Sequence, residues 1–180
     1  MPTKTVDTFT AREPLETVRA DLAVQIPLTM AAGFACQKGD VIGQIASSGF
    51  GRRRARSLVT AMAFATTSPT GTVAEGTLFK TGDVLNSAGG AVGTIQSIAG
   101  NTITLAANAG VAVATGAAVL ASDGSQVAKA IVDEGSDGVG ETPVRVFIGG
   151  YLKESKLRGL DQAAKTELGG VSLPSDIFKF

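Results

Sequence analysis

The 180-residue sequence predicts a mainly β fold with one short helix near the C-terminal end. Short apolar runs of strand length alternate with turns rich in glycine, of which the chain has 23. Residues 157–168 instead carry apolar side chains at spacings of three and four, which is typical of one face of a helix. Hydrophobic residues make up 44% of the chain, enough for a core, but aromatic residues contribute only 5%. We therefore expect no large aromatic pocket.

Residues 1–20 have neither a helical nor a strand period. Isolated apolar residues such as Val6 and Phe9 stand among polar and charged ones. We expect an N-terminal arm that is poorly ordered unless a partner holds it in place. The next segment, residues 22–28, alternates in part and is predicted to be a strand, and Pro27 places it at a sheet edge or a strand end.

A second strand, residues 41–45, is predicted behind the Gly39-Asp40 turn, and four arginines then fall within residues 52–56. We expect this basic segment to be a loop that faces solvent or a partner. A nucleic-acid patch is the less favoured alternative, because Phe50 is the one aromatic residue beside it and the chain has no second basic run.

Residues 58–120 differ in composition from the rest of the chain, because they contain only three charged residues. Residues 79–85 repeat the turn-to-strand pattern of residues 38–42. Residues 93–106 form two apolar runs around Ala99-Gly100-Asn101, which is a good signal for a β-hairpin. We therefore expect a β-module in this part of the chain.

The last third of the chain is mixed. After the polar turn Ser122-Asp123-Gly124-Ser125 we expect an apolar strand that ends at Asp133, and a second strand over residues 142–150. Asp161 suits the N-terminus of the predicted helix, and Gly169-Gly170 suits its end.

The composition argues against most kinds of chemistry. The 16 basic and 16 acidic residues balance, which leaves no net field to hold nucleic acid or an acidic membrane. The chain has no histidine, the usual acid–base group near neutral pH and a frequent zinc ligand. Its single cysteine, Cys36, allows no intrachain disulfide or cysteine cluster and is predicted to be a small buried side chain.

Neither the acidic residues nor the glycine pairs predict a calcium or phosphate site. Residues 133–138 resemble a calcium loop, but position twelve of that loop would be Val144, where a glutamate is required. No glycine pair precedes a long helix, which a phosphate-binding loop needs. We therefore predict that the protein is not an enzyme, and we assign no catalytic residue, cofactor or metal ligand. The sequence lacks a signal-peptide layout and any apolar run near the ~20 residues of a membrane span, so we expect a soluble protein made in a cytoplasm.

The order of these segments resembles one known family. The run Lys38-Gly39-Asp40-Val41-Ile42, the Asp-Gly-Ser turn with the strand behind it, the strand at residues 142–150 and the closing helical pattern follow one another as in the phage head decoration proteins of the lambda type. These are small trimeric proteins on the outside of an icosahedral capsid. The resemblance covers roughly residues 25–57 and 121–180.

The resemblance implies a small β-barrel or β-clip-like decoration domain, built from residues 21–57 and 121–180, that carries residues 58–120 as an inserted β-rich subdomain. Residues 1–20 correspond to the capsid-binding arm of the family. The implied function is that of a structural virion protein, which binds the outer capsid surface as a homotrimer at local three-fold positions and stabilises the mature head. Its partners are then the major capsid protein and further copies of this chain, with neither nucleic acid nor a membrane.

Candidate contact residues follow from the residue types together with this resemblance. The candidates for capsid binding are Val6, Phe9, Thr10, Arg52, Arg53 and Arg54. The tail, residues 177–180, is expected to add a last strand or to seal a subunit contact, for which Phe178 and Phe180 are the candidates.

An alternative function is a carbohydrate- or host-surface-binding module displayed on a virion, with residues 58–120 as its working part. Carbohydrate sites usually expose aromatic rings. This segment has only Phe64 and Phe79, both among apolar neighbours, which argues against the alternative.

Overall fold

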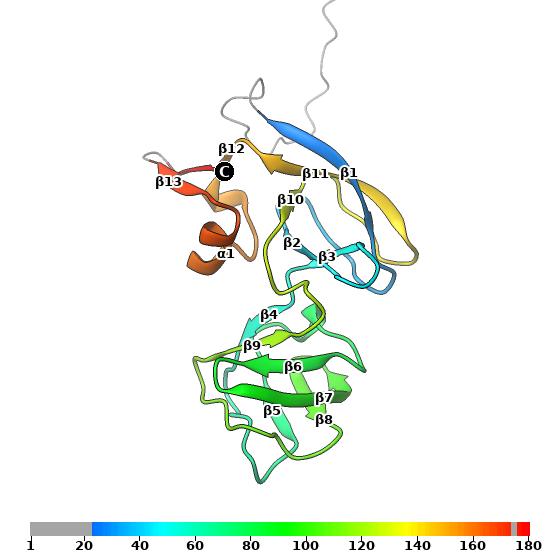
Figure 1. Cartoon of the computed structure of the whole chain (residues 1–180), viewed down its shortest axis with the longest axis vertical. Coiled ribbons are helices and arrows are strands. Elements are labelled where there is room, and N and C mark those ends of the chain that lie inside the picture. Colours follow the sequence, from blue (N-terminus) through cyan, green and yellow to red (C-terminus); the bar gives the residue numbers. More distant parts are fainter. Residues whose placement is uncertain (1–22, 174–175) are drawn as a thin grey trace, which may run out of the picture.

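The computed structural model describes residues 23–173 and 176–180, so the predicted N-terminal arm with Val6, Phe9 and Thr10 lies outside the described residues. The described chain is mainly β with one short α-helix, as the sequence predicts. It forms a closed five-stranded barrel, a six-stranded sheet and a three-stranded sheet. Figure 1 shows the six-stranded sheet at one end of the molecule and the other two β-structures at the opposite end.

The barrel contains strands from both halves of the chain, in the order β1, β11, β10, β2 and β3. Their bounds are Val24–Met30 for β1, Val41–Gln44 for β2, Gly51–Arg53 for β3, Ala130–Val132 for β10 and Thr142–Gly149 for β11. Neighbours are antiparallel, except that β1 and β3 meet in parallel at the single pair of Met30 and Gly51. The interior is filled by apolar side chains such as Met30, Ile42, Val132 and Val146. The small β-barrel expected from the resemblance is therefore present.

One edge of β1 is open. This strand pairs with β11 along its whole length, but among the described residues its second edge has no backbone hydrogen bond before Met30. Pro27 lies within this strand, in agreement with its predicted place at an edge, because proline has no N–H to donate to a ladder.

The six-stranded sheet, with its loops, spans residues 56–121, and we refer to it as the module. Its strands follow the order β4, β9, β6, β7, β8 and β5, and β4 and β5 approach each other through the bridge of Val59 and Val73. The bounds are Arg56–Leu58 for β4, Thr70–Thr72 for β5, Val84–Ser87 for β6, Gly90–Ala99 for β7, Thr102–Leu105 for β8 and Ala118–Ala121 for β9, with a 3₁₀ helix η2 at Gly76–Leu78. Strands β7 and β8 form the hairpin predicted around Gly100, whose φ of +59° fits the turn.

The module has a hydrophobic cluster of its own, which includes Phe64, Leu85, Ile95 and Ile103. The barrel interior has a second cluster, and the barrel and the C-terminal sheet share a third. The chain crosses between the module and the rest of the molecule twice, between β3 and β4 and between β9 and β10.

The C-terminal sheet has the strand order β12, β14, β13 and packs with helix α1. The bounds are Tyr151–Lys153 for β12, Gln162–Glu167 for α1, Val171–Leu173 for β13 and Ile177–Lys179 for β14, with a 3₁₀ helix η3 at Glu154–Lys156. The last strand predicted for the tail is therefore β14. Phe178 on this strand is fully buried and stacks on Phe180, with 5.3 Å between the ring centroids. The prediction of a subunit contact is wrong for Phe178, because its own chain covers the whole side chain.

Helix α1 is shorter than the predicted segment 157–168. The Asp161 carboxylate accepts a hydrogen bond from the Ala164 N–H at 2.7 Å, so Asp161 is the N-cap, as its position suggested. Gly159 has a φ of +78°, which is incompatible with a helix at this point, and Leu157 and Leu160 pack onto the core from an irregular segment. Gly169, with a φ of +69°, ends the helix.

The repeated sequence pattern at residues 38–42 and 79–85 forms two similar turns. In the first, the Gln37 N–H donates to the Asp40 carboxylate at 2.7 Å, and in the second the Lys80 N–H donates to the Asp83 carboxylate at 3.0 Å. The glycine before each aspartate has a φ of +88° or +90°, a backbone conformation that glycine adopts without strain. Each turn thus places one carboxylate at the start of a strand.

Candidate functional site

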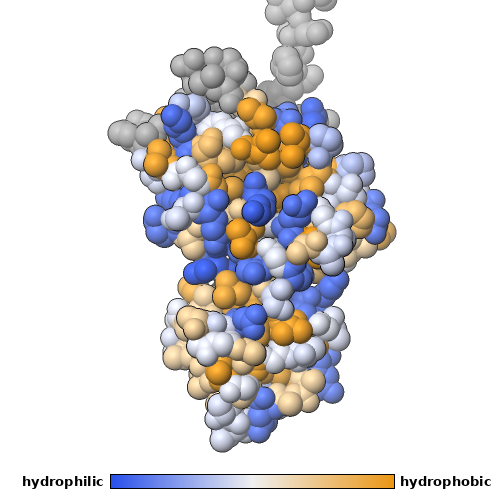
Figure 2. Space-filling view, viewed as in Figure 1, coloured by the Kyte–Doolittle hydropathy of each residue, from blue (hydrophilic) through white to orange (hydrophobic). Residues whose placement is uncertain are grey.

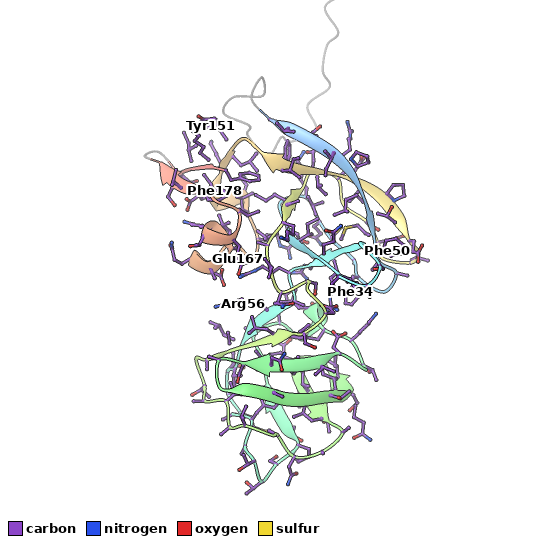
Figure 3. The ribbon with its side chains drawn as sticks, viewed as in Figure 1. Phe34, Phe50, Arg56, Tyr151, Glu167 and Phe178 are labelled. Carbon is purple, nitrogen blue, oxygen red and sulfur yellow. The ribbon has the colours of Figure 1, made fainter. Side chains whose placement is uncertain are left out.

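The arginines of the basic segment lie where the barrel, the module and the α1 region meet. Figure 3 places Phe34 and Arg56 between the module and the rest of the molecule, with Glu167 of α1 above Arg56. Arg52 on β3 is fully buried and donates to Asp83 and to the Leu78 carbonyl of the module, at 2.8 and 2.6 Å. It therefore connects the barrel to the module.

Arg52 also has partners on the barrel side. It pairs with Asp123 at 2.9 Å, and its guanidinium carbon lies 4.0 Å from the centre of the Phe34 ring. A buried guanidinium needs several partners to offset its lost hydration, and these contacts supply them for Nη1 and Nη2.

The next two arginines point to other parts of the chain. Arg53 pairs with Asp40 at 3.2 Å and with Glu75 of the module at 2.6 Å. Arg54 is buried and pairs with Asp161 at 2.9 Å and Glu167 at 3.0 Å, which attaches α1 to the barrel.

The prediction that this segment is a solvent- or partner-facing loop is wrong. Arg52 and Arg53 belong to strand β3, and the acids that bind them and Arg54 are distant in sequence. The candidate role in capsid contact is wrong for Arg52 and Arg54, because both side chains are buried and their donors bind inside the molecule. Arg53 is also mostly covered, and its guanidinium bridges Asp40 and Glu75.

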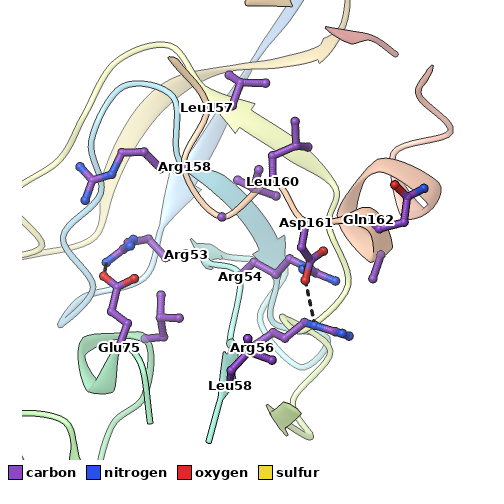
Figure 4. A pocket seen from close by; sticks show the side chains of 14 residues that line it. Arg53, Arg54, Arg56, Leu58, Glu75, Leu157, Arg158, Leu160, Asp161 and Gln162 are labelled. Atoms are coloured by element: carbon purple, nitrogen blue, oxygen red, sulfur yellow. Dashed lines mark hydrogen bonds and ion pairs between the residues drawn. The ribbon is translucent and has the colours of Figure 1, made fainter. Parts of the chain in front are cut away.

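A pocket of about 510 Å³ opens beside these arginines (Figure 4). One wall is formed by Arg56 and Leu58 of β4, and the other by the segment from Leu157 to Ala163, which includes Leu160. Arg56 Nε lies 3.0 Å from the Asp161 carboxylate across the pocket. A smaller pocket of about 340 Å³ shares Arg53 and Arg158 with it and is lined in addition by Asp40 and Thr77.

The carboxylates at the pocket are held in their charged form. Partial burial raises the pKa of Asp161, but the Ala164 N–H and the charges of Arg54 and Arg56 together outweigh burial, so the pKa lies below its ordinary value. Burial likewise raises the pKa of Glu75, and the hydrogen bond and charge of Arg53 outweigh this and lower it. Both groups are therefore ionised near neutral pH and act as permanent partners of the arginines.

Sequence reasoning did not identify this pocket. Arg56 belongs to the basic segment, but nothing in the local sequence around Leu58 or Arg158 indicates that they share a cavity with it. Their proximity results from the pairing of β4 with β9 and from the path of residues 157–163 across the barrel.

A second surface feature lies at the end of the barrel away from the module. Val24 and Ile26 on β1 and Ile148 on β11 are exposed, and a register shift between Val24 and Gln25 lies beside Ile148. Figure 2 shows hydrophobic residues gathered around this end on the face in view. The patch adjoins the open edge of β1, so backbone donors and acceptors and apolar side chains are available in the same place.

Other groups offer little chemistry. Cys36 is buried, as predicted, and burial raises the pKa of its thiol despite a hydrogen bond to the Ser136 backbone. Within residues 23–173 and 176–180, no three or more Asp, Glu, Cys or His side chains are grouped so that they could hold a metal ion. In the same part of the chain, no helix has the length and apolar character needed to cross a membrane.

Comparison with known proteins gives no match: neither a family model, nor a curated protein, nor a solved structure is similar to this chain.

Proposed function

We propose that this chain is a structural virion protein, which binds the outer surface of a phage capsid as a homotrimer at local three-fold positions and stabilises the mature head. The sequence resemblance suggests this function, and the mainly β fold with its small barrel is compatible with it. The major capsid protein is the proposed partner.

The difference between the two ends of the molecule is the observation that carries the proposal. The exposed Val24, Ile26 and Ile148 lie at one end, where the open edge of β1 begins (Figure 1). The module, whose outer strands β4 and β5 approach each other, lies at the other end (Figure 1). A free strand edge with apolar neighbours is suited to strand addition by a partner chain. We therefore place the shell at the β1 end and the module on the outside.

In the proposed mechanism, the protein stabilises the head only through the free energy of its binding. A protein that binds the mature lattice but not dissociated subunits stabilises the lattice by mass action. Three linked copies bind more tightly than one, because the first contact raises the effective concentration of the other two.

The alternative of a carbohydrate-binding module is less well supported. Phe64 and Phe79, the two aromatic residues of the module, are both buried in its cluster. The module therefore offers no aromatic ring on which a sugar could stack.

Co-sedimentation with mature shells tests the proposal. Deletion of residues 1–20 should abolish binding and leave the melting temperature nearly unchanged. Ile26→Lys should weaken binding, because it places a charge in the proposed contact. Met62→Lys is the matched control, since Met62 is similarly exposed (46% against 39% for Ile26) but lies in the module. If the full-length protein does not sediment with shells, or if the two lysine variants bind equally, the proposal is wrong.

A further inference from the structure

The pocket between β4 and residues 157–163 has the size and position of a ligand site. Its volume of about 510 Å³ falls within the range of about 300–1,000 Å³ usual for ligand pockets. It also lies where the barrel, the module and the α1 region meet, and such junctions are frequent places for binding sites. What it can bind depends on which hydrogen-bonding groups remain unused.

The acceptors on Asp161 are already occupied. Its Oδ1 accepts from Arg54 Nη1 and from the Ala164 N–H, at 2.9 and 2.7 Å, and its Oδ2 pairs with Arg56 Nε at 3.0 Å. Glu75, the second carboxylate of the pocket, is bound through Oε1 by Arg53 at 2.6 Å and by Thr77 at 3.2 Å.

Among the charged groups, Glu75 Oε2 is one acceptor without a described partner, and a larger number of donors is left over. Arg56 uses Nε alone, and its Nη1 and Nη2 have no partner within the described residues. Arg158 directs Nη1 to Gln37 and lies with Nε 3.3 Å from Asp40, which leaves Nη2 without a described partner. A guanidinium with two unused Nη groups is suited to a carboxylate, which it binds through two parallel hydrogen bonds.

The wall beside Arg56 is apolar. Leu58 follows two residues later on β4, so it lies on the same face of the strand. It is 49% exposed, although Val59 beside it is buried in the module cluster. Leu157 and Leu160 line the facing wall. The pocket therefore offers an anion-binding group next to an aliphatic surface.

We propose that this pocket binds an acidic peptide segment, in which a glutamate side chain pairs with Arg56 and a neighbouring aliphatic side chain packs against Leu58, Leu157 and Leu160. The charges of the pocket's arginines are largely neutralised by the carboxylates that pair with them, so the pocket has little net charge to attract an anion. The unused Nη groups instead determine which ligand binds. The small net charge also favours a peptide over a nucleic acid, which needs an extended basic surface. The inference does not depend on the proposed function, because the free protein already contains the complete pocket.

A titration of the free full-length protein tests the inference. The probe is a capped six-residue peptide with Leu-Glu at its centre, and the control peptide has Leu-Gln in the same place. NMR signals of the Leu58 methyl groups and the Arg56 Nε–H should shift and saturate with the first peptide. The glutamine peptide should bind at least about tenfold more weakly, because an amide cannot form the charged pair.

Two variants and one matched control accompany the titration. Arg56→Gln should weaken binding about tenfold and remove the preference for glutamate, and Leu58→Ser should weaken binding of both peptides. Arg145→Gln is the control, since Arg145 is exposed on β11 outside the pocket. Equal binding of the two peptides would overturn the inference, and so would equal shifts caused by inorganic phosphate alone or the absence of any saturable shift.

Discussion

Arg52 is the residue on which the connection between barrel and module most depends. It is fully buried, and its Nη1 and Nη2 have four acceptors: both oxygens of Asp83, one of Asp123, and the Leu78 carbonyl. A buried ion pair contributes little net stability when complete, because desolvation offsets its attraction. Removal of one partner is costly, because it leaves the other charge buried and unpaired.

Arg52→Ala should therefore lower the free energy of unfolding by about 3–5 kcal/mol. Asp83 and the Leu78 carbonyl would lose their partner inside the protein. Urea denaturation measures the effect. Arg145→Ala is the control: its side chain is 56% exposed and pairs loosely with Glu134 at 3.5 Å, so the change should stay within about 1 kcal/mol. If both variants unfold at the same urea concentration, the structural role assigned to Arg52 is wrong.

Asp161 should make stability depend on pH in the acid range. Its pKa is lower in the folded than in the unfolded protein, so its contribution is complete above the unfolded pKa of about 3.9 and is lost as the pH falls through the folded pKa. Asp161→Asn keeps a good N-cap but removes the charge. The variant should be less stable than the parent near neutral pH, and the difference should shrink below about pH 4. Urea denaturation at several pH values measures the stability difference between the variant and the parent. A difference that stays constant with pH would contradict the prediction.

The burial of the arginines could not be predicted from the sequence. Four arginines in five positions normally indicate a solvated surface, because buried charges are rare. Their partners Asp83, Asp123, Asp161 and Glu167 follow Arg52 or Arg54 by 31 to 113 residues. Only the folded arrangement of the strands brings these acids to β3.

Strand β2 is positioned by a very close contact with the Ser122–Ser125 turn. A Cβ added at Gly43 would lie 1.9 Å from the Ser125 carbonyl oxygen, so the two backbones can approach only because residue 43 is glycine. Gly43→Ala should cost about 2 kcal/mol or more, because backbone must move. Gly140→Ala is the control, since a Cβ there meets nothing within 4 Å. Equal melting temperatures for the two variants would show that β2 can shift away from the turn.

The module should fold without the rest of the chain. Its cluster, which contains Phe64, Leu85, Ile95 and Ile103, is formed almost entirely within residues 56–121, and its two termini at β4 and β9 are paired strands. A fragment of residues 55–122 should therefore give a cooperative thermal transition by circular dichroism. A fragment without such a transition would mean that the contacts of Arg52 and Arg53 are needed for the module to fold.

Elements with local signals were predicted well. The Gly100-Asn101 turn determines the β7–β8 hairpin, and the Gly39-Asp40 turn leads into β2, as expected. The helix was predicted too long, because the apolar spacing continues through Leu157 and Leu160, whereas Gly159 adopts a left-handed conformation there. Apolar spacing indicates which side chains are buried, and the side chains of an irregular segment can be buried as well as those of a helix.

The two ends of the molecule differ. Their arrangement depends on contacts between segments that are far apart in sequence. Both ends expose some apolar residues, but the β1 end has an open strand edge beside them, whereas the module end has a sheet whose outer strands approach each other. The buried guanidinium of Arg52 holds the two ends together, so we expect the module to keep a fixed direction relative to the barrel.

Electron cryo-microscopy of mature phage heads, prepared with and without this protein, tests the central claim most directly. We predict additional density for three copies at local three-fold positions on the outer surface, with the open edges of β1 against the shell and the modules directed outward. Density on the inner surface, modules packed against the shell, or heads that show no additional density at saturating protein would contradict the account.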